Sequence, residues 1–195
     1  MATVASGGRD HIGPYRLLKM IQVGNATHIW EAINSTDQRR VALKIPRAEH
    51  AESRIEAAGL KHEYDVGVSL NHPHLIRFYE LGYFRKVPYL VMEYFAAPNL
   101  KQFQRQTPDR LLELMPRVVW QMLDALCHFH DKQWVHRDIK PENVLMDESG
   151  LVKVIDFAIA QRVRKGLGRI FAGKTPVQGT RSYISPEQIR REPVD

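Results

Sequence analysis

The sequence predicts an α+β fold in which a strand-rich half precedes a helix-rich half. Up to about residue 94 the chain alternates short apolar runs with turn residues, and one helical stretch interrupts them. After Pro98 apolar residues recur at helical spacing, and two short strands follow. Neither an internal repeat nor a low-complexity tract divides the 195 residues. With a prior of about 150 residues per domain, we expect one domain built from two lobes.

The first half is predicted to contain five strands and one helix. Its strands are bounded by turn residues and include many β-branched and aromatic side chains. The helix must end before Pro73, because the residue that precedes a proline avoids the helical conformation. Gly82 is expected to open the turn between the last two strands. The strands are expected at 15–23, 28–33, 40–45, 75–81 and 87–94, and the helix at 50–70.

The second half is predicted to contain a long helix and a hairpin. Pro116 is expected in or just before the first turn of this helix, where proline is tolerated. Strands at 144–146 and 151–155 are expected to be joined by a turn at 147–150. Four apolar residues recur at spacings of four, four and three and form one helical stripe. They are Val118, Met122, Leu126 and Phe129.

Composition excludes several classes of protein. Hydrophobic residues make up 44% and charged residues 26%, which is typical of globular rather than disordered chains. Cys127 is the only cysteine, so neither a disulfide framework within the chain nor a cysteine-based zinc cluster can form. No apolar run approaches the roughly 18 residues that span a bilayer, and the first residues lack the apolar core of a signal peptide. We therefore expect a cytoplasmic protein without a membrane segment.

The excess positive charge is concentrated in one segment. Between Asp156 and Glu187 the chain has six basic residues and no acidic ones, which equals its net charge of +6. The segment could attract acidic substrates or a phosphorylated neighbour, or it could be a solvated loop, which we slightly favour. A nucleic-acid partner is a low-ranking alternative, because no known nucleic-acid-binding motif accompanies the charge. The basic residues are Arg162, Arg164, Lys165, Arg169, Lys174 and Arg181.

Three short segments combine charged residues with apolar neighbours. The segment 136–143 reads His-Arg-Asp-Ile-Lys-Pro-Glu-Asn, and an Asp-Phe-Ala segment begins eighteen residues after Asp138. Upstream, Val-Ala-Leu-Lys at 41–44 lies on a predicted strand. Together these motifs resemble the catalytic domain of eukaryotic-type serine/threonine protein kinases, and the resemblance extends over about 15–195.

The resemblance implies a two-lobed, protein-kinase-like α+β fold. Residues 1–13 are expected to be a flexible leader, 14–94 a strand-rich N-lobe with one long helix, and 95–195 a partial helical C-lobe. The C-lobe would hold the catalytic loop and the activation segment and would end after that segment. We interpret the chain as a C-terminally incomplete kinase domain. Any continuation beyond Asp195 is left open by this interpretation, as is the activity of the 195 residues alone.

Phosphoryl transfer needs cations and oriented metal ions around the negative charge of the transferring group. Lys44 has apolar strand neighbours that fix its stem, so its ammonium group could reach a phosphate oxygen. The resemblance implies that Glu63, nine residues before His72, is the helix glutamate that holds this lysine. Glu52 and Glu56 are competing candidates on the same predicted helix.

The catalytic loop is expected to supply the base and part of the metal site. Asp138 would orient the attacking hydroxyl and accept its proton. Asn143 and Asp156 offer the oxygen ligands that Mg²⁺ prefers. Lys140 stands where serine/threonine-directed relatives carry a lysine that contacts the phosphoryl group. The resemblance therefore implies ATP and Mg²⁺ as cofactors and protein substrates as acceptors.

The resemblance also implies a nucleotide site. The backbone of Glu93 and Phe95 would bond the adenine edge, and Asn99 is the expected ribose contact. Ala42 and Leu145 are expected to sandwich the purine, and they would be core residues in any case. The implied nucleotide-binding residues are Gly24, Ile29, Ala42, Lys44, Met92, Glu93, Phe95, Asn99 and Leu145.

The chain departs from the family pattern at several places. Only Gly24 remains of the three glycines that bring backbone close to phosphate, and Gln22 and Thr27 replace the others. Ala158 replaces the glycine after Asp-Phe, at a cost of about 1 kcal/mol or more if its φ must be positive. Gly67 stands where the family usually has a bulky apolar residue that packs toward the Phe of Asp-Phe. We expect slower handling of phosphates and a harder transition to the active arrangement.

Regulation by phosphorylation is suggested by Arg137. In relatives with an arginine before the catalytic aspartate, a phosphate on the activation segment pairs with it and orders the segment. Thr175 is the first candidate for that phosphate, and Ser182 is another option. Thr180 is expected to have the substrate-side role typical of serine/threonine kinases.

Two functions from different classes are consistent with these residues. The expected one is a protein kinase that transfers the γ-phosphoryl group of ATP to Ser or Thr, because all five charged or metal-binding essentials are present. The alternative is a pseudokinase, an ATP-binding or scaffolding module with little transferase activity, which the incomplete glycine loop favours. The five essentials are Lys44, Glu63, Asp138, Asn143 and Asp156.

Overall fold

The structure is a computed structural model that describes residues 10–163 and 181–190. These residues form two compact units. The first contains the described residues up to Tyr64 together with Phe78–Tyr94. The second contains Asp65–Arg77 and the described residues from Phe95 onward.

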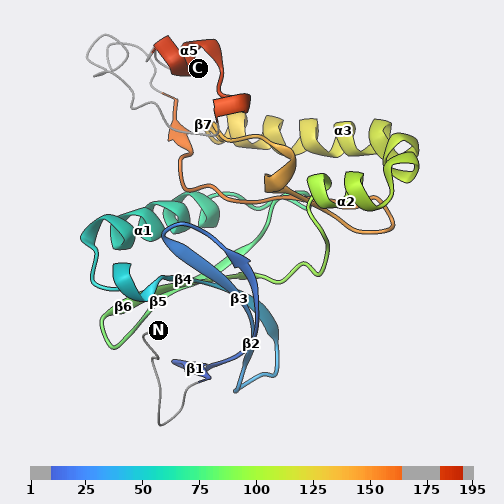
Figure 1. The fold of residues 1–195 in the computed structure, drawn as a ribbon. Helices are drawn as coiled ribbons and strands as arrows, with labels where there is room; N and C mark the ends of the chain where they lie inside the picture. The colour runs from blue at the N-terminus through green and yellow to red at the C-terminus, as the bar shows by residue number, and fades with distance from the viewer. Residues whose placement is uncertain (1–9, 164–180, 191–195) are drawn as a thin grey trace. The chain divides into compact units, whose positions relative to one another are not determined.

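The first unit is an antiparallel six-stranded sheet with one helix (Figure 1). Its strand order is β1-β2-β3-β4-β6-β5. Strands β1 to β4 form a meander, and the hairpin of β5 and β6 joins it because β6 pairs with β4. The predicted strands 15–23, 28–33, 40–45 and 87–94 are confirmed within one residue at each end. The elements are β1 (His11–Ile12), β2 (Tyr15–Val23), β3 (Thr27–Asn34), β4 (Arg40–Pro46), η1 (Ala48–His50), α1 (Arg54–Val68), β5 (Phe78–Phe84) and β6 (Val87–Glu93).

Strand β4 lies inside the sheet, between β3 and β6, and is buried on both faces. Successive side chains of a strand point to opposite faces. Val41, Leu43 and Ile45 belong to the buried apolar cluster of the sheet. Ala42 and Lys44 therefore lie together on the other face of the strand. The alternation thus places Lys44 on the face of β4 that is opposite the apolar cluster.

The turn between β5 and β6 corrects the sequence prediction. Gly82 lies inside β5, opposite Tyr89, and does not open the turn. The turn is made by Arg85 and Lys86, whose φ angles are +50° and +69°. Positive φ at both central residues is the geometry of a tight two-residue hairpin. The predicted strand 75–81 was therefore about three residues too early, and Leu75 pairs with Val154 in the second unit instead.

The second unit contains two helices, a short helix near its end and two small antiparallel sheets. One sheet pairs β8 with β9, and the other pairs β7 with β10. The apolar cluster of this unit joins α2, α3, β8 and β9. The elements are α2 (Leu100–Gln106), α3 (Pro108–Asp131), β7 (Trp134–Val135), η2 (Pro141–Asn143), β8 (Val144–Met146), β9 (Val152–Val154), β10 (Gln161–Arg162), η3 (Arg181–Tyr183) and α5 (Pro186–Arg190).

Helix α3 begins earlier than predicted, because Pro108 rather than Pro116 occupies its first turn. Pro116 lies inside the helix. Val118 and Phe129 are fully buried, as the stripe predicted, but the buried positions between them are Gln121 and Ala125. Gln121 is buried because its side chain donates to the carbonyl of Gly150 (2.7 Å) and accepts from the N–H of Val152 (3.2 Å). A polar side chain thus holds the β8–β9 turn against the helix.

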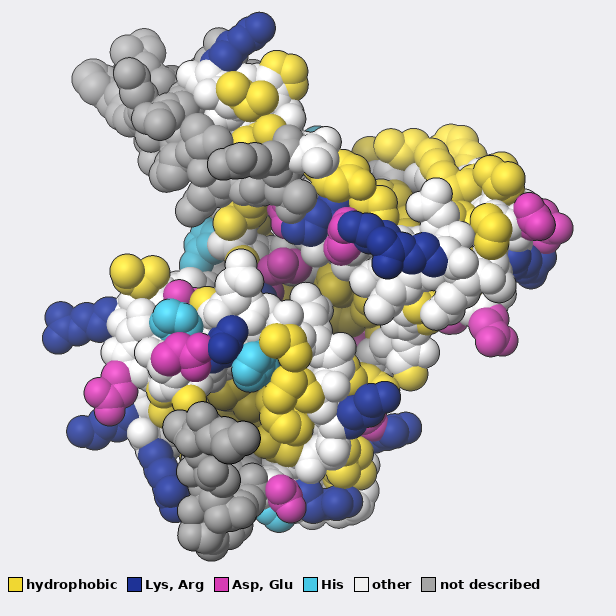
Figure 2. All heavy atoms as spheres, in the orientation of Figure 1, with side chains coloured by type: hydrophobic (Ala, Val, Ile, Leu, Met, Phe, Trp, Pro, Cys, Tyr) yellow, Lys and Arg dark blue, Asp and Glu magenta, His cyan; other side chains and the backbone are white. Residues whose placement is uncertain are grey.

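Helix α3 is also apolar on its exposed surface. Figure 2 shows hydrophobic side chains gathered over this helix. An ordinary surface helix has a single apolar stripe, whereas α3 has exposed apolar residues as well as buried ones. The exposed ones are Leu112, Val119, Trp120 and Leu123.

Three histidines lie together where the loop after α1 meets α3. The rings of His72 and His128 stack with centroids 5.1 Å apart, and His74 contacts His72 edge-on at 5.6 Å. The Nδ1 atom of His72 accepts the backbone N–H of His74 at 3.2 Å. The ring proton of His72 therefore sits on Nε2, which is 3.2 Å from the carboxylate of Asp124. Burial lowers the pKa of His72 more than Asp124 raises it.

We expect this cluster to make stability depend on pH. Because the pKa of His72 is lower in the folded chain than its ordinary value of 6.5, the unfolded chain binds more protons below that pH, and stability falls as pH decreases. A second proton would have to bind Nδ1 of His72, which already accepts the N–H of His74, and the charged ring would stack on His128. His72→Asn is therefore expected to reduce the loss of melting temperature between pH 7.5 and 5.5. His130→Asn is the matched control, because His130 lies exposed on α3, the helix that carries His128. Equal losses in both variants would contradict the prediction.

None of the helices in the described part of the chain has the length and apolarity that crossing a bilayer would take.

Candidate active site

The buried lysine of β4 is held by a carboxylate from α1. Lys44 Nζ is 2.7 Å from Glu63 Oε2, and the two side chains are only 11% and 2% exposed. Glu52 is exposed and precedes the helix, and Glu56 lies in its first turn. The ion pair is therefore made by the glutamate that the resemblance implied, and both charges are almost completely removed from water.

Several of the predicted nucleotide-binding residues share one face of the sheet. In an antiparallel sheet, residues directly opposite each other point to the same face. Ile29 is opposite Lys44, and Ala42 is opposite Met92. Since Ala42 and Lys44 are two residues apart on β4, all four side chains lie on that face. Glu93 follows directly as the last residue of β6.

Gly24 forms the tight turn between β2 and β3. Its N–H donates to the carbonyl of Thr27 at 2.9 Å. A Cβ atom at this position would lie 2.8 Å from the same carbonyl oxygen, which is closer than real Cβ contacts allow. The one glycine that remains of the family pattern is thus required by the turn itself. Gln22 and Thr27 lie in the flanking strands β2 and β3.

In the second unit, His136 connects the start of the loop 136–143 to the residue before Asp156. Its Nδ1 accepts the N–H of Asp138 (3.2 Å), and its Nε2 lies 3.1 Å from the carbonyl of Ile155. The proton therefore sits on Nε2, and burial lowers the pKa of His136, which keeps the ring neutral. The rings of His136, Phe129 and Phe157 contact one another with centroids 5.0–5.7 Å apart. This fully buried cluster fixes the loop on α3.

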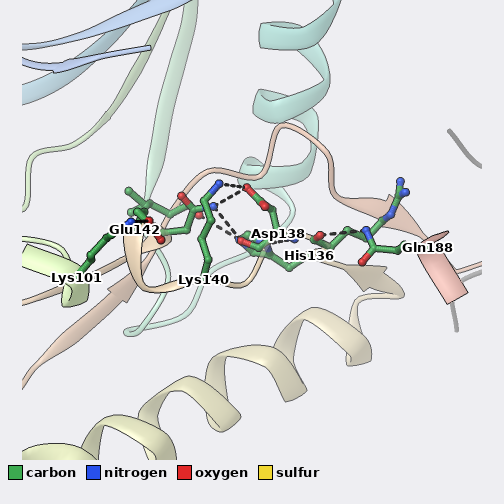
Figure 3. Close-up of polar contacts among 9 residues, drawn as sticks. Lys101, His136, Asp138, Lys140, Glu142 and Gln188 are labelled. Atoms are coloured by element: carbon green, nitrogen blue, oxygen red, sulfur yellow. Dashed lines mark hydrogen bonds and ion pairs between the residues drawn. The ribbon is translucent and has the colours of Figure 1, made fainter. Parts of the chain in front are cut away.

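The carboxylate of Asp138 is the centre of a polar network (Figure 3). Its Oδ2 accepts hydrogen bonds from Lys140 Nζ at 2.6 Å and from Asn143 Nδ2 at 2.9 Å. Asn143 Nδ2 also donates to the backbone carbonyl of Asp138 at 2.9 Å. Asp138, Lys140 and Asn143 are thus brought together, and the carboxylate is held in one orientation.

Asn143 and Asp156 bracket the β8–β9 hairpin. The N–H of Ile155 donates to the carbonyl of Asn143 at 2.9 Å, which ties the two open ends of the hairpin together. Asp156 has a φ of +66°, in the left-handed region that non-glycine residues rarely adopt. Strained backbone of this kind tends to occur at functional sites. Because the amide nitrogen of Asn143 is occupied by Asp138, its Oδ1 is the atom that remains to bind a cation.

The side-chain oxygens of Asn143 and Asp156 fit Mg²⁺. The described residues contain no group of three or more His, Cys, Asp or Glu side chains that could hold a metal ion. Mg²⁺ is commonly held by one or two protein oxygens together with phosphate oxygens and water. A site of Asn143 and Asp156 has that composition, so a bound phosphate would be needed to complete it.

Asn99 and Leu145 are paired in an isolated bridge. Asn99 is also the N-cap of α2: its Oδ1 accepts the N–H of Gln102 (2.9 Å), and its own N–H donates to Gln102 Oε1 (3.0 Å). The side-chain oxygen of Asn99 thus has a structural role. Leu145 lies half-buried in β8, and Phe95 is the first residue after the first unit.

Comparison with known proteins decides the family. The model of the protein kinase domain matches residues 15–195. The chain belongs to the protein kinase family. It is 33% identical over 187 residues to the serine/threonine-protein kinase PrkC of Bacillus subtilis, covering 94% of this chain and 28% of the relative. It is 36% identical to a probable serine/threonine-protein kinase of Streptomyces coelicolor, covering 97% and 28% of the two chains.

The relationship extends to the serine/threonine-protein kinase PknB of Mycobacterium tuberculosis, which is 31% identical over 93% of this chain and 29% of its own. The chain therefore spans less than a third of the length of these relatives. Membership confirms the predicted resemblance and, with the strand-rich first unit, the predicted kinase fold class.

The kinase domain also contains site residues that the sequence motifs did not indicate. Phe129 packs on His136, and Gln188 Nε2 donates to the carbonyl of Arg137 at 3.1 Å. Phe129 could have been found, because it ends the predicted stripe of α3. Gln188 could not, since nothing in the sequence connects α5 with the loop. Arg137 has a φ of +69°, and burial lowers the pKa of its guanidinium.

Two further predictions concern the activation segment of this kinase domain. Thr175 and Thr180 lie outside the described residues, and their proposed roles stay predictions. Ala158 lies among the described residues and is not one of those with positive φ. The backbone cost that a positive φ would impose on this alanine therefore does not arise in this arrangement.

Proposed function

We propose that this kinase domain transfers the γ-phosphoryl group of ATP to Ser or Thr hydroxyls of protein substrates. The observation that carries the proposal is the fixed carboxylate of Asp138, which Lys140 and Asn143 hold by 2.6 and 2.9 Å hydrogen bonds. The names of the relatives support Ser/Thr acceptors. In this proposal residues 14–94 and 95–195 are the two lobes.

Lys44 would bind phosphate oxygens of ATP. The 2.7 Å contact with Glu63 supports this role, because it fixes the ammonium group in a nearly water-free position. A cation in such surroundings interacts more strongly with a phosphate than one in bulk water. Gly24 and the shared face of Ile29, Ala42 and Met92 would receive the rest of the nucleotide.

The remaining nucleotide contacts are proposed from the resemblance. Glu93 and Phe95 would bond the adenine edge through their backbone, and Leu145 would lie against the purine. Because Oδ1 of Asn99 caps α2, its side-chain nitrogen Nδ2 would make the contact with the ribose.

Asn143 and Asp156 would hold Mg²⁺ through their side-chain oxygens. When bound, the ion would neutralise part of the phosphate charge. The bond between Ile155 and Asn143 supports the assignment, because it keeps the two ligand-bearing segments at a fixed separation.

In the transfer step, the substrate hydroxyl oxygen forms a bond to the γ-phosphorus as the bond to the β–γ bridging oxygen breaks. The electron pair of the broken bond leaves with ADP, and the hydroxyl proton passes to the carboxylate of Asp138. Lys140 would stabilise the charge on the transferring group from its place beside Asp138. His136, neutral and buried, takes no proton and acts by positioning the loop.

Phosphate transfer from γ-labelled ATP to a protein substrate in the presence of Mg²⁺ tests the proposal. Asp138→Asn keeps the shape and the hydrogen-bond acceptor but removes the base, and we expect it to lower kcat by about 100- to 10,000-fold. Its melting temperature should stay close to that of the wild type. Equal transfer by the wild type and the variant would overturn the proposal.

A pseudokinase role is the second candidate, and the loss of two glycines at Gln22 and Thr27 favours it. The same experiment separates the two functions. If neither protein transfers phosphate but ATP still raises the melting temperature of the wild type, an ATP-binding or scaffolding role is the better assignment.

A further inference from the structure

A second ion pair, outside the proposed machinery, joins α2 to the catalytic loop. Lys101 lies in the first turn of α2, and its Nζ is 2.5 Å from Glu142 Oε1. Glu142 lies in η2, two residues after Lys140. Four side chains of alternating charge thus follow one another: Lys101, Glu142, Lys140 and Asp138 (Figure 3).

Burial increases along this series. The side chains of Lys101 and Glu142 are 46% and 30% exposed, whereas those of Lys140 and Asp138 are 17% and 10% exposed. Charges that are shielded from water interact more strongly than exposed ones. Water therefore screens the effect of a charge change at the outer pair less at Lys140 and Asp138 than it would at exposed groups.

Glu142 depends on Lys101 for its charge partner. Its Oε2 is buried and has no hydrogen-bond partner among the described residues. Hydrogen bonding to Lys101 lowers the pKa of Glu142, and the charge of Lys140 contributes in the same direction. If Lys101 were absent, Lys140 would remain as a cation of the loop that acts on this carboxylate.

The backbone gives Lys101 a fixed position relative to the loop. The capping box of Asn99 and Gln102 fixes the start of α2. The N–H of Met146 donates to the carbonyl of Pro98 at 3.0 Å, which ties the segment before α2 to β8. Strand β8 begins directly after Asn143. The hydrogen bond from Met146 to Pro98 and the capping box together therefore fix the start of α2, with Lys101, relative to the catalytic loop.

We propose that Lys101 is a positioning residue, which keeps Glu142 from drawing Lys140 away from Asp138. The inference rests on the proposed phosphoryl transfer, in which Lys140 acts beside the base. Lys101 contacts none of the reacting groups in this view. It acts through Glu142, by supplying the cation that this carboxylate would otherwise take from Lys140.

Steady-state kinetics with a four-member mutant cycle tests the proposal. Lys101→Met is expected to lower kcat about fivefold, with less than about a twofold change in KM for ATP, because a coupling between neighbouring charges is being removed. The double variant Lys101→Met/Glu142→Gln is expected to recover most of kcat, since the competing carboxylate is gone. Lys101→Arg should retain the wild-type kcat, because it keeps the positive charge.

Two outcomes would overturn the proposal. If the double variant were as slow as Lys101→Met, or slower, Lys101 would be only a tether between α2 and the loop. If Lys101→Met had wild-type kcat, Glu142 would not compete for Lys140.

A readout independent of activity distinguishes this proposal from the proposed function. The ¹⁵N resonance of the Lys140 ammonium group should shift in Lys101→Met and return in the double variant. This result would support the positioning role even if the wild type transferred no phosphate, in which case the proposed function alone would fail. An unchanged resonance in Lys101→Met would contradict the positioning role.

Discussion

Lys44→Met is expected to lower kcat/KM for ATP by on the order of 100-fold or more, because it removes a preorganised cation from a site shielded from water. The same change is expected to destabilise the fold. Glu63 would be left as a buried carboxylate without its lysine, and breaking a buried ion pair by removing one partner costs about 3–5 kcal/mol. Urea-induced unfolding measures this second effect.

The double variant Lys44→Met/Glu63→Leu separates the two consequences. Replacement of both charges by apolar residues should recover much of the stability, because neither charge of this buried pair is then left without the other. It should not recover activity, because no cation is restored.

Arg47→Met is the matched control, since Arg47 pairs with Glu49 at 2.7 Å on the surface, where the side chains are 35% and 52% exposed. It should cost less than about 1 kcal/mol. Full activity in the double variant would contradict the role given to Lys44.

Gly82→Ala is expected to destabilise the first unit by about 1–3 kcal/mol or more through overpacking. A Cβ atom at Gly82 would lie 2.2 Å from Cζ of Tyr89. The ring cannot move aside easily, because it is buried, packs edge-on against Tyr15 at 5.8 Å and donates to Glu80 Oε1 at 3.2 Å. Chemical unfolding followed by the signal of the folded sheet measures the effect.

Gly59→Ala provides a control of opposite sign. Gly59 lies in α1 with no atom within 4 Å of the added Cβ, so alanine should stabilise the helix by up to about 1 kcal/mol. Gly82→Ala/Tyr89→Leu should be less destabilised than the sum of its single variants, because the clash is removed with the ring. Strict additivity would show that the Tyr89 ring is not the cause.

The sequence predicted the strands of the first unit well, because each is a separate apolar run between turn residues. It failed at Gly82, where a glycine was interpreted as a turn. The structure shows that this glycine makes room for the Tyr89 ring from the neighbouring strand. The turn at Arg85 and Lys86 carries neither glycine nor asparagine, so local composition gave no indication of its positive φ angles.

The family resemblance implied the ion pair of Lys44 and Glu63, and the motif at 136–143 placed Asp138, Lys140 and Asn143 in one predicted site. Other long-range contacts could not be predicted in this way. Gln121 reaches the turn before β9 across about thirty residues of sequence, and Lys101 reaches Glu142 across forty-one. Such pairs depend on how helices and hairpins pack, which single-sequence patterns do not specify.

The pairing of β8 with β9 determines which insertions and deletions the catalytic domain can tolerate between Asn143 and Asp156. Asn143 and Asp156 are kept together by the pairing of Val144 with Val154 and by the bond from Ile155, and not by the number of residues that lie between them. Insertions at the turn 147–150 would therefore leave their separation unaltered, at the cost of local contacts only. Deletion of one residue from β9 would reverse the faces of its side chains and place a different residue where Asp156 now lies. Variants of this domain that differ in length between these two residues should accordingly differ at the turn and preserve the paired strands.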